Sequence, residues 1–397
     1  MADRWTLDRV RELDERDPLA EVRRRFELPH GVCYLDGNSL GALASGVAQR
    51  MRAVVEDEWG VDLARSWSHG TWMDAPVRVG DRIARLIGAH DGEVLVADTT
   101  SIALAKLVGA ALAARPGRRV VVSTTDNFPS DLYAATAVAA RAGAVLRVVD
   151  RHELAPALGD DVALVCLTHV DFRTGALHSI PEVTRAAHEA GALMLWDLCH
   201  SAGALPVGCE EHGVDLAVGC TYKYLNGGPG APSFLYVRRS LQDRLENPLP
   251  GWLGHEAPFG FEPEYRPAAG IRRFLTSTPP VLQLAALDAA LDAFEGVEID
   301  DVRAKSSALG QLFIELVDDA GVPGLEVASP REAGARGSQV SLRHARAADV
   351  VAGAADRGVV GDLRPPDICR FGLAAPYLSF EDVFRAAATV VEVAQAL

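Results

Sequence analysis

The stretch Thr221-Tyr222-Lys223-Tyr224-Leu225-Asn226-Gly227-Gly228-Pro229-Gly230 decides the fold that the sequence predicts. The apolar segment 214–220 before it is typical of a buried strand, whereas the glycines and proline after it can continue neither a strand nor a helix. Lys223 is therefore expected at a strand end, inside the fold. Burial disfavours a charged ammonium, and a neutral amine is a nucleophile towards aldehydes. The alternative is a lysine that extends into solvent from a glycine-rich turn.

A second strand end precedes this stretch. The apolar segment 192–196 leads into Asp197, which is followed by His200. In open α/β sheets, ligands bind at the carboxyl ends of the strands. Pyridoxal phosphate (PLP) needs a lysine that holds its aldehyde as an imine and a carboxylate that keeps its pyridine nitrogen protonated. Lys223 and Asp197 together favour PLP, although Asp197 alone is equally well explained as a helix N-cap.

Composition restricts the class of protein. The chain has 397 residues and is 49% hydrophobic, which predicts a large domain plus a smaller one. Its formal charge of −15 repels phosphate backbones, so we expect no nucleic-acid partner. Residues 1–25 are densely charged and no apolar run is long enough to cross a bilayer, so we expect a cytoplasmic protein without membrane contact. The six cysteines contain no C-x-x-C pair, which predicts small buried side chains and neither a metal site nor disulfides.

Strand-like and helix-like segments alternate along much of the chain, which predicts a mainly parallel sheet covered on both faces. The expected strands are 93–97, 119–123, 144–149, 161–167, 193–196 and 233–238, and the expected helices include about 43–58, 74–88, 131–142 and 180–190. Neither G-x-G-x-x-G nor G-x-x-x-x-G-K-[ST] occurs, which argues against dinucleotide and nucleoside triphosphate binding.

We expect three structural regions. Residues 1–60 form an N-terminal arm and helix that belong to the small domain, and residues 61–280 form the large ligand-binding domain. Residues 281–397 comprise an interdomain helix, opened by Pro279-Pro280, and the C-terminal small domain.

Two polar segments have two explanations each. After an expected strand, Thr100 and Ser101 lead into an alanine-rich helix that we expect to start near Ile102. Free N–H groups, the helix dipole and the hydroxyls at this helix N-terminus suit a phosphate. Ordinary N-capping is the plainer explanation. The turn Gly37–Gly41 either meets a ligand or caps the following helix.

Aromatic and cationic residues elsewhere are also candidates. Trp67 and Trp72 lie in a loop-like stretch, and aromatic residues on loops are frequent in binding surfaces. Arg370 lies in a strand-like run, where it is either a surface charge or a fork for a substrate carboxylate.

These segments, in this order, resemble the kynureninase family of PLP-dependent hydrolases, which have the aspartate-aminotransferase fold (fold type I). The resemblance extends from Tyr34 to about Phe380. It rests on the lysine motif and on the strings G-N-S-L-G (37–41), F-P-S-D (128–131), W-D-L-C-H-S-A-G (196–203) and G-W-L-G-H-E (251–256). It implies an α/β large domain with a mainly parallel, seven-stranded type of sheet and a smaller α+β C-terminal domain. It also implies hydrolysis of the Cβ–Cγ bond of L-kynurenine to anthranilate and L-alanine, in tryptophan catabolism.

The resemblance assigns roles to individual residues. Lys223 would hold PLP as an imine, and Asp197, assisted by His200, would pair with the pyridine nitrogen. Tyr222 would contact the phosphate and take part in acid–base chemistry, and Phe128 would stack on the ring. Further cofactor contacts would come from Thr100, Ser101, Pro129, Ser130, Asp131 and Thr168.

Substrate and partner contacts follow from the same resemblance. Arg370 would bind the α-carboxylate of an amino-acid substrate, and Asn38, Ser39 and Trp67 would line its pocket. Trp252 and Thr278 would come from the partner subunit, which implies a homodimer with shared active sites.

The sequence leaves alternatives open. Thr278 and Trp67 lie where some relatives have asparagine and histidine, so the preference between kynurenine and 3-hydroxykynurenine is open, with kynurenine favoured by a match to the bacterial branch. Another enzyme on the same scaffold, such as an aminotransferase or a cysteine desulfurase, would share Lys223 and Asp197. A binding protein that kept the fold and lost catalysis is the remaining alternative.

Overall fold

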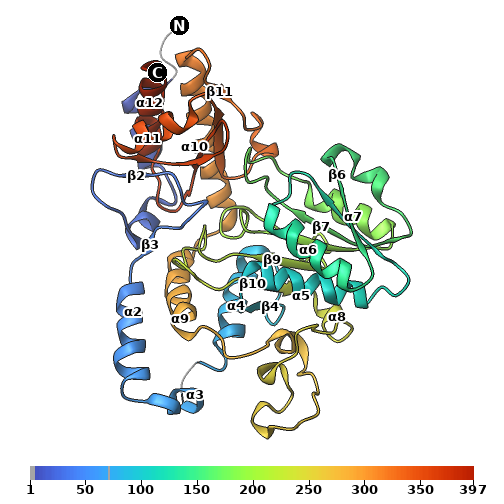
Figure 1. Ribbon diagram of the computed structural model, residues 1–397. Helices are drawn as coiled ribbons and strands as arrows, with labels where there is room; N and C mark the ends of the chain where they lie inside the picture. Colours follow the sequence, from blue (N-terminus) through green and yellow to red (C-terminus); the bar gives the residue numbers. More distant parts are fainter. Residues whose placement is uncertain (1–4, 70–71) are drawn as a thin grey trace.

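A seven-stranded sheet forms the centre of the computed structural model, which describes residues 5–69 and 72–397 (Figure 1). The strand order is β4-β10-β9-β8-β7-β5-β6. The strands are Val94–Val96 (β4), Val120–Thr124 (β5), Val145–Val149 (β6), Val162–Thr168 (β7), Leu193–Asp197 (β8), Leu216–Gly219 (β9) and Phe234–Val237 (β10). Strands β5 to β9 are parallel, which confirms the predicted mainly parallel sheet.

Strand β10 differs from the expected pattern because it runs antiparallel to both of its neighbours, β4 and β9. The connection from β9 to β10, residues 220–233, contains the lysine stretch and no helix. The chain therefore turns back beside β9 without the helical crossover that joins parallel strands.

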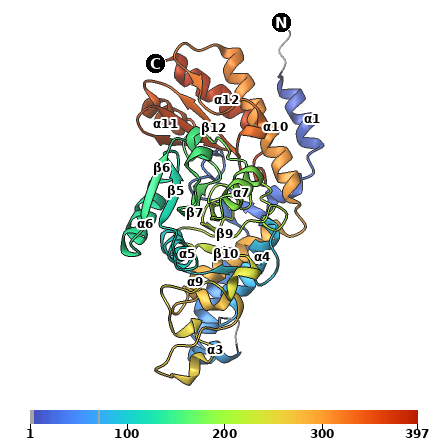
Figure 2. The same ribbon diagram turned by 90° about the vertical axis from the view of Figure 1, so that its right-hand side faces the viewer.

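Helices bury both faces of this sheet (Figure 2). They are Ala75–Ile87 (α4), Thr100–Ala113 (α5), Pro129–Arg141 (α6), Ile180–Glu189 (α7) and Val281–Ala290 (α9). Helices α5 and α6 share one hydrophobic cluster with alternate strand residues such as Leu195, and α4, α7 and α9 share the other with residues such as Trp196. Strands β7 to β10, which lie inside the sheet and are covered on both sides, are almost entirely apolar and buried, whereas the edge strand β6 is partly exposed. Among the described helices, none has the length and apolar character needed to cross a bilayer.

A second sheet, of order β11-β12-β15-β14, forms the C-terminal region. Its strands are Glu326–Val327 (β11), Gln339–Arg343 (β12), Asp362–Arg364 (β14) and Ile368–Gly372 (β15). The helices beside it are Ile299–Ala320 (α10), Ala347–Ala355 (α11) and Phe380–Gln395 (α12).

The N-terminal arm lies against this C-terminal region, as Figure 1 shows. Helix α1 (Leu7–Glu15) packs on α12, and β2 (Cys33–Tyr34) pairs in parallel with β13 (Val359–Val360). This contact agrees with assigning the N-terminal arm to the small domain, whose residue bounds stay a prediction.

The segment expected as a helix over 43–58 begins later than predicted. Helix α2 (Val47–Ala53) continues into a turn of π-helix (Val54–Trp59), and its N-cap is Gly46, at a φ of 87° that favours glycine. The explanation of Gly37–Gly41 as the cap of this helix is therefore wrong. The stretch around Trp67 was expected to be loop-like and instead includes a short helix, α3 (Ser66–His69).

The prediction that the cysteines are buried is confirmed for all but one of them. All six are free thiols, and all except the half-buried Cys33 are buried.

Gly219 ends β9 two residues before the lysine stretch begins, and it has a steric role. It lies opposite Phe234 on β10, and a Cβ atom on Gly219 would be 2.4 Å from the Phe234 ring. Glycine in a strand often marks such a close approach.

We expect Gly219→Ala to lower the free energy of unfolding by about 1–3 kcal/mol, because the added methyl group overpacks the core. Urea denaturation measures this change. In a Phe234→Leu background, where the ring is absent, the same substitution should cost clearly less. An equal cost in both backgrounds would contradict the steric explanation.

Candidate active site

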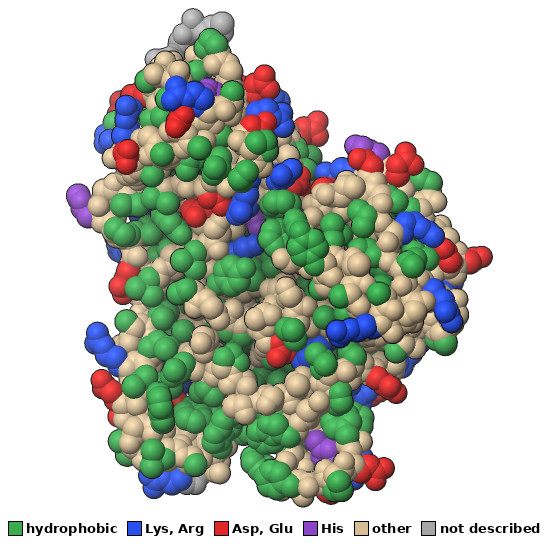
Figure 3. All heavy atoms as spheres, viewed as in Figure 1, with side chains coloured by type: hydrophobic (Ala, Val, Ile, Leu, Met, Phe, Trp, Pro, Cys, Tyr) green, Lys and Arg blue, Asp and Glu red, His purple; other side chains and the backbone are tan. Residues whose placement is uncertain are grey.

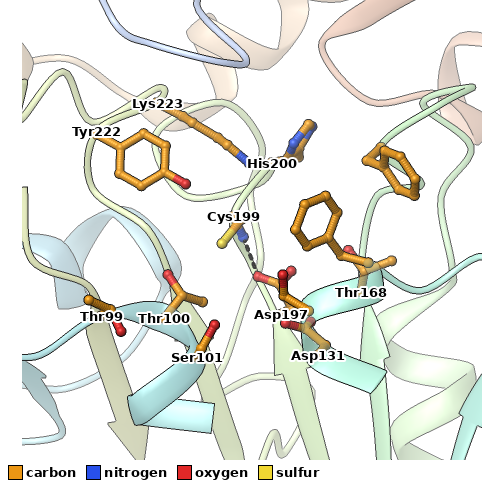
Figure 4. A pocket seen from close by; sticks show the side chains of 13 residues that line it. Thr99, Thr100, Ser101, Asp131, Thr168, Asp197, Cys199, His200, Tyr222 and Lys223 are labelled. Atoms are coloured by element: carbon orange, nitrogen blue, oxygen red, sulfur yellow. Dashed lines mark hydrogen bonds between the residues drawn. The ribbon is translucent and has the colours of Figure 1, made fainter. Parts of the chain in front are cut away.

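A cavity opens at the carboxyl edge of the large sheet (Figure 4). Asp197 ends β8, and Lys223 follows the end of β9, the adjacent parallel strand. The two residues therefore face the same cavity. Its lining residues are Thr99, Thr100, Ser101, Phe128, Ser130, Asp131, Thr168, Phe172, Asp197, Cys199, His200, Tyr222 and Lys223.

Lys223 differs from the other lysines of the chain. The sequence contains only three lysines. Buried Lys106 forms an ion pair with Asp98, and buried Lys305 forms one with Asp17 at 2.5 Å. Within residues 5–69 and 72–397, Lys223 forms no ion pair, and its half-buried side chain extends into the cavity instead of into open solvent (Figure 4). Its amine is available to a ligand.

Two buried carboxyl groups meet in this cavity. Asp131, in the first turn of α6, is 2% exposed, and Asp197 is 5% exposed. Asp197 accepts a hydrogen bond from the Cys199 N–H at 2.8 Å, which is a local turn and not the helix N-cap considered above. Burial, together with neighbouring Asp197, raises the pKa of Asp131 well above its usual value.

The carboxyl pair provides a test of whether PLP fits the site. Among the described residues, Asp131 Oδ2 is buried and has no hydrogen-bond partner. An unpaired buried oxygen beside a second carboxylate is costly unless a positively charged donor compensates it. A protonated pyridine nitrogen is such a donor, so the carboxyl pair fits PLP.

A candidate anion site lies at the start of α5. Thr99 is the N-cap of this helix, but its side chain makes no capping hydrogen bond, so ordinary capping does not explain the row of hydroxyls. The preceding residue, Asp98, has a φ of 57°, a costly left-handed conformation, and its carboxylate is held by Lys106. Free N–H groups, the helix dipole and the Thr100 and Ser101 hydroxyls together suit a phosphate.

Aromatic rings and two neutral polar groups complete the wall. The Phe128 and Phe172 rings pack edge to face with 5.2 Å between centroids, and Phe128 is 39% exposed, so part of its ring is accessible to a ligand. Burial, reinforced by Lys223 and Arg370, lowers the pKa of His200 well below its usual value, so its imidazole is neutral. Burial raises the pKa of Tyr222 far above its usual value, so its phenol keeps its proton.

The predicted substrate residues Asn38, Ser39 and Arg370 form a cluster behind the cavity wall. Arg370 is fully buried, so the explanation as a surface charge is wrong. Its Nε donates to Asp362 Oδ1 at 2.8 Å, its Nη2 to Ser39 Oγ at 2.7 Å, and its Nη1 to the Phe172 carbonyl at 2.8 Å. Since Phe172 lines the cavity, this cluster adjoins it directly.

Besides Asn38, Ser39 and Arg370, four further predicted site residues do not line the cavity of the single chain. Pro129 is the first residue of α6, where its fixed φ suits a helix start. Trp67 packs edge to face on Trp72, with 5.4 Å between ring centroids. Trp252 is half-buried in another segment, and Thr278 is exposed. Their assignment to the site stays a prediction.

Sequence analysis missed several residues of the site. Thr99 directly precedes the predicted phosphate residues, and its place before the helix was an available signal. Phe172, Gln339 and Asp362 follow no local pattern, because they reach the site through the pairing of distant segments.

Comparison with known proteins places the chain in a family. A family model described as the kynureninase C-terminal domain matches residues 302–390. The chain is 47% identical to the kynureninase of Pseudomonas fluorescens over 389 residues, which cover 96% of this chain and 94% of that protein. It is 46% identical to a kynureninase of Burkholderia pseudomallei over 397 residues, which cover 98% of this chain and 95% of that protein.

Solved structures share the fold at much lower identity. A cysteine desulfurase from Thermococcus onnurineus aligns with a TM-score of 0.79 and 21% identity, covering 95% of this chain and 98% of that one. A variant of the cystine C-S lyase C-DES, with glycine covalently linked to its PLP cofactor, aligns with a TM-score of 0.80 and 17% identity. The alignment covers 93% of this chain and 99% of that one. These structures confirm the fold class, and the near full-length identity to two kynureninases shows that the chain belongs to the kynureninase family.

Proposed function

We propose that the protein is a PLP-dependent hydrolase that cleaves the Cβ–Cγ bond of L-kynurenine and releases anthranilate and L-alanine. The observation that carries the proposal is the shared cavity of Lys223, Asp197 and Asp131, in a chain 47% identical to a kynureninase. A cytoplasmic location stays a prediction.

The chain offers a partner for each part of PLP. Lys223 would bind the aldehyde carbon, and Thr100, Ser101 and Tyr222 would hold the phosphate. Burial beside Asp197 raises the pKa of Asp131, and the carboxyl pair would accept a hydrogen bond from the protonated pyridine nitrogen. Phe128, Ser130 and Thr168 would contact the ring and its substituents.

When bound, PLP supplies an electron sink for the carbanion at the substrate Cα. With the substrate bound to PLP in its place, the free Lys223 amine would take the Cα proton and later return a proton to Cα, so that alanine keeps its Cα–H bond. A water molecule then adds to the γ-carbonyl and the Cβ–Cγ bond breaks. The oxygen of the water ends in the carboxylate of anthranilate, and Cβ gains a proton to become the methyl group of alanine. Tyr222, whose phenol remains protonated, is the acid available beside the lysine.

Arg370 would bind the α-carboxylate of the substrate. Asp362 and the Phe172 carbonyl hold its guanidinium in one orientation, and Ser39 Oγ is bound to its Nη2. A guanidinium held in this way loses little side-chain entropy on binding a carboxylate. Asn38 lies in the same buried cluster.

A homodimer is the second part of the proposal. Large apolar side chains are exposed on the lower part of the molecule, where α2, α3 and the segment 249–278 lie (Figure 3). They include Trp59 at 56% exposure, Leu63 at 60%, Phe259 at 60% and Phe261 at 79%. Large exposed apolar surfaces are typical of protein interfaces. A second copy of the chain would cover this surface and bring Trp252 and Thr278 towards the partner's cavity.

An assay with product identification tests the reaction. We expect purified protein with PLP to form anthranilate and alanine from kynurenine, without any keto acid, and to use 3-hydroxykynurenine less efficiently. A requirement for a keto acid would indicate an aminotransferase, and persulfide formation from cysteine would indicate a desulfurase.

Lys223→Ala provides the matched variant for this assay. It should lose covalent, borohydride-reducible PLP attachment, as measured by mass spectrometry, and reduce turnover by about 10³-fold or more, since it removes both the attachment point and the base. Lys305→Arg, which keeps the positive charge of a buried ion pair elsewhere, should retain attachment. Normal turnover by Lys223→Ala would exclude the assigned role.

Because its pKa is raised on folding, Asp131 should lower the free energy of unfolding of the cofactor-free protein by an amount that depends on pH. A carboxyl whose pKa is raised by folding favours the folded state at low pH, and this contribution is lost as pH rises from about 4 towards the folded pKa. Asp131→Asn removes the cost, so its melting temperature relative to the original chain should rise between pH 5 and pH 8, while PLP binding weakens. A difference in melting temperature independent of pH would contradict this assignment.

Mixed dimers test the shared active site. Lys223→Ala and Trp252→Ala should each be impaired alone, because each loses a group required at both sites. Co-expression should restore activity, since each mixed dimer regains one site with Lys223 from one subunit and Trp252 from the other. Mixed dimers, isolated with two affinity tags, that remain as inactive as the parents would indicate that Trp252 serves its own subunit.

A further inference from the structure

A buried glutamine, Gln339, connects three parts of the molecule behind the cavity. It begins β12 in the C-terminal sheet and is 1% exposed. Its Oε1 lies 3.2 Å from Nδ1 of His200, in the large-sheet region, and 3.4 Å from Nδ2 of Asn38, in the N-terminal turn. Its Nε2 lies 3.5 Å from both the Phe172 carbonyl oxygen and Ser341 Oγ.

The surroundings determine which way the Gln339 amide points. The Ser341 hydroxyl donates its proton to the Arg173 carbonyl at 2.5 Å, so Ser341 Oγ offers only lone pairs to Gln339. The Phe172 carbonyl is also only an acceptor. The amide nitrogen of Gln339 must therefore face these two oxygens, and its oxygen must face His200 and Asn38.

This orientation determines the tautomer of His200. An amide oxygen can only accept a hydrogen bond, so the proton of the imidazole must be on Nδ1. Burial, with the positive charges of Lys223, Arg370 and Arg364, keeps the ring neutral. Nε2 is then unprotonated, and it makes no hydrogen bond to any described residue. Since His200 lines the cavity, an acceptor is available to a ligand there.

We propose that Gln339 is a positioning residue that fixes the Nδ1–H tautomer of His200, so that Nε2 accepts a hydrogen bond from a hydroxyl or N–H group of the bound cofactor or substrate. The proposal rests on the proposed function for the identity of that ligand. The tautomer itself follows from contacts within the chain. The same amide oxygen holds Asn38, so it also links the predicted substrate pocket to the edge of the cofactor site.

The test reads the tautomer directly in the PLP-loaded protein. Long-range ¹H–¹⁵N correlation spectra of protein labelled with ¹⁵N-histidine distinguish a protonated from an unprotonated ring nitrogen, and His200→Asn assigns the signals. We expect His200 in the original chain to show protonated Nδ1 and unprotonated Nε2. A protonated Nε2 in the original chain would overturn the proposal.

Two substitutions separate the accepting oxygen from the rest of the side chain. Gln339→Met removes the amide and keeps a similar length, so the Nε2–H tautomer of His200 should appear and PLP should bind about two- to tenfold more weakly, as expected for one lost hydrogen bond. Gln339→Glu keeps an accepting oxygen towards His200, so Nδ1 should stay protonated. An unchanged His200 spectrum in Gln339→Met would overturn the proposal.

Gln242 provides a matched control for the loss of a buried amide. It is 4% exposed and does not line the cavity, and its Nε2 donates to the Gly92 and Val237 carbonyls at 2.9 and 3.0 Å. Gln242→Met should leave both the His200 spectrum and PLP affinity unchanged. Because the spectra report on His200 whether or not kynurenine is cleaved, a failure of the proposed reaction and a failure of the tautomer assignment give different results.

Discussion

The active-site region depends on two carboxyl groups that are buried side by side. Asp131 lies in the first turn of a helix on one face of the sheet and Asp197 ends a central strand, and burying two carboxyl groups side by side is unfavourable for both. The chain thus retains a local cost in stability that a positively charged ring nitrogen would remove. The cofactor-free chain is less stable because of these two groups, and the site is complete only when the cofactor is bound.

The sheet explains why these groups meet. Parallel strands present their carboxyl ends at one edge, so the residues after β7, β8 and β9 converge there although they are far apart in sequence. The N-terminus of helix α5 lies at the same edge, since it follows β4. The C-terminal sheet then closes over this edge through Arg370 and Gln339, whose contacts reach Phe172 and His200. The site lies between two sheets and requires both.

The shared architecture does not determine the reaction. Cysteine desulfurases align over nearly the whole chain at about one fifth identity. In this protein, the cysteine that lines the cavity, Cys199, follows Asp197 within the fold and is buried, with its sulfur accepting a hydrogen bond from the Cys220 N–H at 3.1 Å. A sulfur fixed in this position is not the mobile loop cysteine that a desulfurase would need.

The sequence by itself determined the alternation of strands and helices and the parallel core of the sheet. It also placed Lys223 and Asp197 at neighbouring strand ends. These features were predictable because apolar runs and glycine breaks are local signals. The sequence did not reveal the reversal of β10 or the later start of α2. The tertiary structure alone decided that Gln339 orients His200 and that Asp362 holds Arg370, because these contacts join segments separated by long stretches of chain. The hydrogen-bond partner of a buried polar group is set by which strands pair, and a linear pattern carries no record of that pairing.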